Sequence, residues 1–167
     1  MPDQPDSTAF EIVRKYDWPL ADVWAAWSTR ERLAAWWGPA GCTVEILRFE
    51  FRPGGLVHYA MRFDGAPAMW GRFNYREIVP MSRVVWLNAF ANEHGGIARA
   101  PFDDRCPLEI ENAVDFREQN GGTILTLRAR PFGALPDERR YFDGLRPSMA
   151  EGYGGTFDRL AEHLAGR

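Results

Sequence analysis

The spacing of apolar residues places helices near both ends of the chain and strands between them. Residues 10–16 alternate between apolar and polar side chains, which predicts a first strand. Pro19 suits the first position of a helix, and apolar residues then recur at helical spacing up to Trp27. Ser28 and Glu31 have the spacing of a capping box, so we expect a second short helix to begin there.

The middle of the chain reads as a series of short strands separated by turns. Pro and Gly residues end most of the apolar runs, and Asn120-Gly121-Gly122 is a strong hairpin signal. Residues 93–107 are rich in Gly, Pro and Asp, and we expect them to form a long loop. The predicted strands cover residues 44–51, 56–63, 69–78, 84–91, 109–116 and 123–129.

The C-terminal segment has the pattern of one long amphipathic helix. Gly144 and Pro147 should interrupt a shorter helix before it, and the pair Ser148 and Glu151 predicts a capping box at its start. Its apolar stripe runs to about Leu164. Three glycines, at positions 152, 154 and 155, are unusual inside a helix, and we expect tight packing against the sheet to explain them better than mobility.

This order of elements predicts an α+β helix-grip fold. Consecutive strands with short turns are antiparallel neighbours, so about six to seven of them should form one curved antiparallel sheet. Two short helices cannot cover such a sheet, and the long C-terminal helix is therefore expected over its concave face. We expect a flexible N-terminus over residues 1–9 and a single domain over residues 10–167.

Several short motifs at the joints of these elements resemble one protein family. They are Trp36-Trp37-Gly38-Pro39, Phe51-Arg52-Pro53-Gly54-Gly55, Glu77-Ile78-Val79-Pro80, Gly121-Gly122-Thr123 and Gly154-Gly155-Thr156-Phe157-Asp158-Arg159-Leu160. In this order they resemble the START-like (SRPBCC) superfamily, and within it the branch similar to the activator of the heat-shock-protein-90 ATPase. The resemblance implies the helix-grip fold over residues 10–165. It also implies a chaperone-associated or stress-response role as one alternative, although the eukaryotic co-chaperones carry an additional N-terminal domain.

The aromatic content suggests that the fold encloses a ligand cavity. Aromatic residues make up 14% of the chain, including 7 Trp and 11 Phe, which is more than a core of this size needs. By alternation and helical spacing, the large side chains of the sheet and the last helix should face one another. The predicted ligand-binding residues are Trp27, Tyr59, Met61, Phe73, Tyr75, Trp86, Asn112, Phe116, Met149, Tyr153 and Phe157.

Charge and the reactive residue types narrow the functions that the chain can have. The net charge is −3, which argues against the basic surface that nucleic-acid binding requires. The three His and two Cys residues have no metal-ligand spacing, so we expect no metal, no cofactor and no covalent catalytic triad. No apolar run is long enough to span a membrane, and there is no signal-peptide pattern, which together suggest a cytoplasmic location.

Three functions remain open from the sequence. The first is binding of a hydrophobic or aromatic small molecule without chemistry, and the second is the chaperone-associated or stress-response role. The third is a cyclase- or hydrolase-type enzyme that uses polar residues in the cavity. Asn112 and Asn88 fall on the apolar face of their strands, where each could contact a ligand or be satisfied by the protein itself, the latter being the commoner case. A homodimer is also compatible with the sequence.

Overall fold

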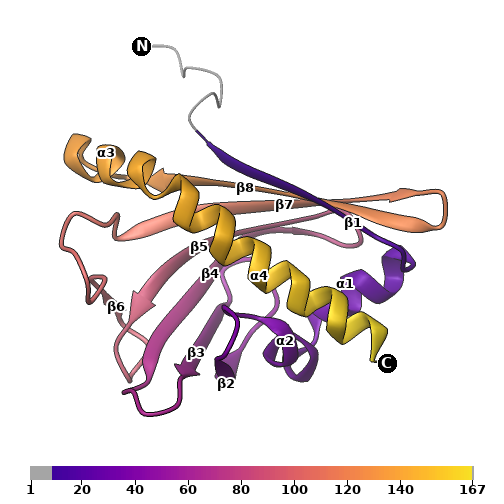
Figure 1. Ribbon diagram of the computed structural model, residues 1–167, viewed down its shortest axis with the longest axis horizontal. Coiled ribbons are helices and arrows are strands. Elements are labelled where there is room, and N and C mark those ends of the chain that lie inside the picture. The colour runs from indigo at the N-terminus through magenta and orange to yellow at the C-terminus, as the bar shows by residue number, and fades with distance from the viewer. Residues whose placement is uncertain (1–8, 167) are drawn as a thin grey trace.

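The computed structural model describes residues 9–166, which form one curved antiparallel sheet and four helices (Figure 1). The strands follow the order β1-β8-β7-β5-β4-β3-β2, and the short β6 pairs with β5. The strands are β1 Phe10–Tyr16, β2 Thr43–Phe49, β3 Leu56–Arg62, β4 Met69–Val79, β5 Arg83–Ala91, β6 Ile97–Ala98, β7 Glu109–Gln119 and β8 Gly122–Phe132. The helices are α1 Leu20–Ser28, α2 Arg30–Trp36, α3 Pro136–Gly144 and α4 Arg146–Ala165.

Helix α4 runs diagonally across one face of the sheet and ends at the C-terminus, drawn in yellow in Figure 1. Helices α1 and α2 lie near the C-terminal end of α4, and α3 lies at the opposite end (Figure 1). None of the four helices in the described part of the chain lies over the opposite face of the sheet (Figure 1). The prediction of an α+β helix-grip fold is therefore confirmed, with the two-residue strand β6 as the one addition.

A cluster of large aromatic rings fills the space beneath α1 and α2. Trp27 is its centre, with ring centroids 4.8 Å from Trp36, 5.7 Å from Trp86 and 5.7 Å from Phe116. The indole N–H of Trp36 donates a hydrogen bond of 3.0 Å to the carbonyl of Ala26, which fixes α2 against α1. Each of these rings is at least nine-tenths buried, and edge-to-face contacts of this kind add to the free energy of hydrophobic burial.

Three local predictions differ from the structure, and two of them concern helix caps. Helix α2 begins at Arg30 rather than at Ser28, whose hydroxyl instead donates to the carbonyl of Trp24 at 2.9 Å. Helix α4 begins at Arg146, so Ser148 lies inside its first turn and does not cap it. The predicted loop 93–107 contains β6, because Ile97 and Ala98 pair with the end of β5. Spacing alone cannot identify a cap, since the capping residue must also leave the helical conformation.

The expected flexible N-terminus over residues 1–9 lies almost wholly outside the described residues. The expectation of a single domain over residues 10–167 stays a prediction. Of the helices within residues 9–166, none is both long enough and apolar enough to cross a membrane.

Candidate functional site

A cavity of about 270 Å³, open to solvent, lies between α4 and the inner face of the sheet. Three parts of the chain form its wall: the turn after α2, the inward side chains of β3 and β5, and one face of α4. The residues on the wall are Trp37, Gly38, Pro39, Tyr59, Met61, Asn88, Met149, Gly152, Tyr153 and Thr156. Most of this surface is apolar, and it is built from rings, thioethers and glycines.

The structure brings four of the eleven predicted ligand-binding residues together on this wall. Tyr59 and Met61 come from β3, whereas Met149 and Tyr153 come from α4. The other seven lie away from the wall, and most of them pack into the core beneath it. These seven are Trp27, Phe73, Tyr75, Trp86, Asn112, Phe116 and Phe157. Direct contact of these seven residues with a ligand stays a prediction. Those in the core pack beneath the residues that form the wall.

The position of Tyr59 depends on a glycine in the neighbouring strand. Tyr59 pairs with Gly71 across β3 and β4. A Cβ atom at residue 71 would lie 2.4 Å from the ring of Tyr59, so only glycine leaves room for the ring. Burial raises the pKa of Tyr59 to about 12, partly offset by a hydrogen bond with Trp37. Tyr59 therefore presents a neutral hydroxyl group at physiological pH.

Sequence reasoning missed the part of the wall that the turn after α2 supplies. Gly38 has a φ of 96°, and a Cβ there would lie 2.7 Å from the sulfur of Cys42. Trp37 and Pro39 flank this glycine and also reach the cavity. The Trp-Gly-Pro motif signals the end of a helix, but nothing in its pattern shows what the turn will face.

Arg159 of α4 holds this turn in place. Its Nη1 amino group lies 3.2 Å from the carbonyl oxygen of Trp37, 3.1 Å from that of Gly38 and 3.0 Å from that of Pro39. The hydroxyl of Thr156 donates to the carbonyl of Gly38 as well, at 3.0 Å. Hydrogen bonds from a charged donor are the stronger kind, so the turn is fastened to the helix that it faces across the cavity.

Replacing Arg159 with Met should loosen this wall, because the aliphatic stem remains while the donors are lost. We expect a loss of about 1.5–3 kcal/mol in the free energy of unfolding. We also expect faster amide hydrogen exchange over residues 37–42, measured by mass spectrometry. Arg14→Met is the matched control, since Arg14 bonds Gly154 and Asp158 of the same helix without contacting the turn. Unchanged exchange over residues 37–42 in Arg159→Met would contradict this account.

The glycines of α4 are not explained by tight packing, which corrects the expectation from the sequence. A Cβ atom added at Gly152, Gly154 or Gly155 would have no atom within 4 Å outside its own neighbourhood. Gly152 lies on the cavity face, three residues after Met149 and four before Thr156. The missing side chain at residue 152 therefore leaves cavity space that any larger residue would occupy.

Two inward-facing amides differ in how the protein satisfies them. Asn112 is fully buried, and its Oδ1 atom accepts a hydrogen bond of 2.6 Å from the hydroxyl of Tyr153. Its Nδ2 atom donates to the carbonyl of Ile110 at 3.3 Å. Asn88, by contrast, lies on the cavity wall, and its buried Oδ1 atom has no hydrogen-bond partner in the described part of the chain.

The cavity wall carries no ionisable group of the kind that usually transfers protons near neutral pH. Its ten residues include no carboxylate, imidazole, thiol, ammonium or guanidinium group. Burial raises the pKa of Tyr153 well above its ordinary value, so this hydroxyl is also neutral. His58 lies on the other face of β3, where it stacks on Trp70 at 5.2 Å and bonds the carbonyl of Asn92. The site can bind and orient a neutral molecule by contact and hydrogen bonding.

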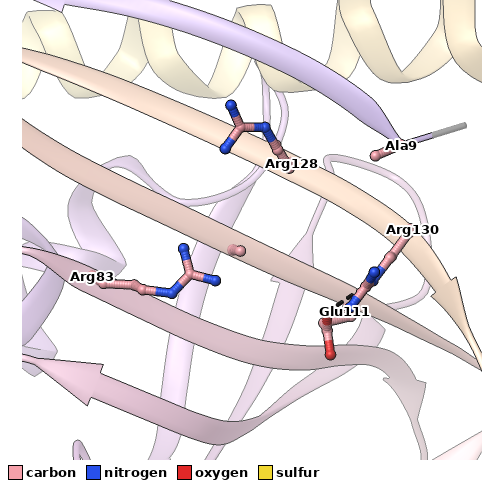
Figure 2. A pocket seen from close by; sticks show the side chains of 6 residues that line it. Ala9, Arg83, Glu111, Arg128 and Arg130 are labelled. Carbon is pink, nitrogen blue, oxygen red and sulfur yellow. Dashed lines mark hydrogen bonds and ion pairs between the residues drawn. The ribbon is translucent and has the colours of Figure 1, made fainter. Parts of the chain in front are cut away.

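The outer face of the sheet has a smaller hollow of about 90 Å³, where three arginines gather on β5 and β8 (Figure 2). Each of them has an acidic partner. The ion pairs are Arg83–Asp115 at 2.8 Å, Arg128–Glu11 at 2.7 Å and Arg130–Glu111 at 2.9 Å. These carboxylates neutralise the arginines, so this hollow offers no strong anion site. Residues 9–166 contain no cluster of three side chains suited to a metal ion.

A family model matches the chain over residues 17–165, and its description is Activator of Hsp90 ATPase homolog 1-like protein. The chain belongs to this family. The match includes nearly every element of the fold and all ten residues of the cavity wall. The resemblance seen in the sequence is thereby confirmed at the level of the family, which leaves the ligand and the activity open.

Solved structures of other proteins have the same fold. A protein from Arthrobacter aurescens superposes with a TM-score of 0.80 at 23% identity, covering 99% of this chain and 90% of its own. NE0264 from Nitrosomonas europaea gives 0.75 at 21% identity, covering 96% of each chain. DynU16, from the dynemicin biosynthetic locus, gives 0.60 at 16% identity, covering 95% of this chain and 48% of its own. No curated protein matches. At these identities the structures support the fold alone.

Proposed function

We propose that this protein of the Hsp90 ATPase activator homolog 1-like family binds an uncharged, largely apolar small molecule in the cavity under α4. The observation that carries the proposal is the wall itself. The wall encloses a concave, mostly apolar space of about 270 Å³ that opens to solvent, which is the usual form of a small-molecule site. Gly152 leaves part of this space unfilled where most residues would occupy it.

Contacts within the protein also hold parts of the wall in place, as a preformed binding site requires. Arg159 and Thr156 fasten the turn at Trp37–Pro39, and Gly71 leaves the space that the ring of Tyr59 occupies. The dense aromatic cluster below supports the floor. Preorganisation lowers the entropic cost of binding, which favours a ligand site over a packing defect.

The direct test is a fluorescence titration with N-phenyl-1-naphthylamine, an uncharged probe whose emission rises in apolar surroundings. We expect a saturable increase with a stoichiometry of one probe per chain. A signal that rises linearly up to the solubility of the probe, without saturation, would contradict the proposal.

The alternative of a chaperone-associated role rests on the family description. An apolar patch on the outer face of the sheet would favour it, and the hollow lined by Arg83, Arg128 and Arg130 on that face carries ion pairs instead. An enzymatic role would need a proton-transferring group on the cavity wall, and the wall offers neutral hydroxyl and amide groups. Binding is therefore the function that the geometry supports best.

A further inference from the structure

The amide of Asn88 is the polar feature that distinguishes this cavity from a simple apolar pocket. Asn88 lies on the inner face of β5, and its partners across the sheet are Phe73 and Ile110, neither of which offers a side-chain hydrogen bond. Its Oδ1 atom is buried without a partner. A buried carbonyl that has lost its water and gained no donor costs about 1–3 kcal/mol.

A neighbouring buried amide, that of Asn112, does receive a hydrogen bond from within the protein. Asn112 lies on the adjacent strand β7, and Tyr153 of α4 donates to its Oδ1 atom at 2.6 Å. Two other buried atoms without partners, the indole nitrogens of Trp27 and Trp86, belong to residues away from the cavity wall. Asn88 alone combines a place on the wall with a buried, unpartnered acceptor among the described residues.

The rest of the wall indicates the shape and charge of a ligand that could donate a hydrogen bond to Asn88. The rings of Trp37, Tyr59 and Tyr153 and the thioethers of Met61 and Met149 all favour contact with an aromatic ring. No cation lies on the wall to pair with a carboxylate, and the nearby guanidinium of Arg159 is taken up by backbone carbonyls. Burying an unpaired charge there would be far more costly than burying a neutral ring.

We propose that the cavity selects uncharged aromatic molecules bearing an N–H or O–H group, whose hydrogen is accepted by Oδ1 of Asn88. This inference rests on the proposed binding function and specifies its ligand class. Aromatic carboxylates and aromatic molecules without a donor are the classes that it disfavours.

The test compares two probes of nearly the same size, indole with its N–H donor and benzothiophene without one. Their dissociation constants are measured by calorimetry for the wild type and for Asn88→Leu, which removes the acceptor and keeps a similar branched shape. Because benzothiophene is the more apolar probe, the decisive quantity is the change in the ratio of the two constants between the proteins. We expect the preference for indole to fall about threefold to tenfold in Asn88→Leu. Indole-3-carboxylate should bind the wild type more weakly than indole.

Asn88→Ala serves as a second variant if Asn88→Leu does not fold, and circular dichroism checks both. An unchanged ratio, with both probes still binding, would overturn the role of Asn88 while leaving the cavity as a binding site. Tighter binding of indole-3-carboxylate than of indole would overturn the preference for uncharged ligands. Failure of every probe, N-phenyl-1-naphthylamine included, would instead overturn the proposed function itself.

Discussion

Trp86→Ala is expected to lower the free energy of unfolding by about 3–5 kcal/mol, as measured by urea denaturation. Trp86 has no exposed surface, and its ring lies 5.0 Å from that of Phe73 and 5.7 Å from that of Trp27. Truncation would leave a large void among rings that cannot close it. The indole N–H of Trp86 has no hydrogen-bond partner, so the truncation also removes a buried, unsatisfied donor. This gain offsets only a small part of the cost of the void.

Trp70→Ala is the matched control for that prediction. Trp70 is partly exposed on the outer face of the sheet, where it stacks on His58. We expect its loss to cost about 1 kcal/mol. Equal stability of Trp86→Ala and Trp70→Ala would contradict the interpretation that the aromatic cluster supports the floor of the cavity. Because Trp86 lies beneath the wall and not on it, loss of ligand binding in Trp86→Ala would reflect collapse of the floor.

Gly152→Leu is expected to weaken binding of N-phenyl-1-naphthylamine at least about tenfold while making the protein more stable. The new side chain projects from the cavity face of α4 into space that holds no other atom within 4 Å of its Cβ. Removing a glycine from the middle of a helix contributes about 0.5–1 kcal/mol of stability. Fluorescence titration and thermal unfolding measure the two effects on the same sample.

Gly154→Leu separates helix stability from cavity filling. Residue 154 lies two positions further along α4, away from the cavity wall, and its Cβ would also meet open space. This variant should gain similar stability and keep the affinity of the wild type. Equal loss of binding in both variants would point to an effect of helix rigidity rather than occupation of the cavity. Full affinity in Gly152→Leu would place the binding site elsewhere.

The order of strands and helices could be predicted from the sequence because it depends on periodicity and turn residues. Alternation along β3 correctly separates Tyr59 and Met61 from His58. Helical spacing likewise places Met149 and Tyr153 on one face of α4. Cap positions were less accurate, since Ser148 has the right neighbours but lies inside the helix.

The composition of the cavity wall could not be predicted in the same way, because alternation gives a side chain's face but not its depth. Trp86 and Tyr59 both point inward, yet Trp86 is sealed under the aromatic cluster while Tyr59 reaches the cavity. The turn at Gly38 is held at the cavity by Thr156 and Arg159, which lie some 120 positions later in the chain. Gly152 contributes through the absence of a side chain, which a search for large apolar residues overlooks.

The most direct test of the binding site is an NMR titration of the methionine methyl groups with indole. Met61 and Met149 lie on the cavity wall, whereas Met81 lies exposed in the turn between β4 and β5. An aromatic ring between the sheet and α4 shifts the resonances of methyl groups that it contacts. We predict saturable shifts at Met61 and Met149 with the same dissociation constant, and none at Met81. Absence of shifts at both wall residues, with indole bound, would contradict the assignment of this cavity as the binding site.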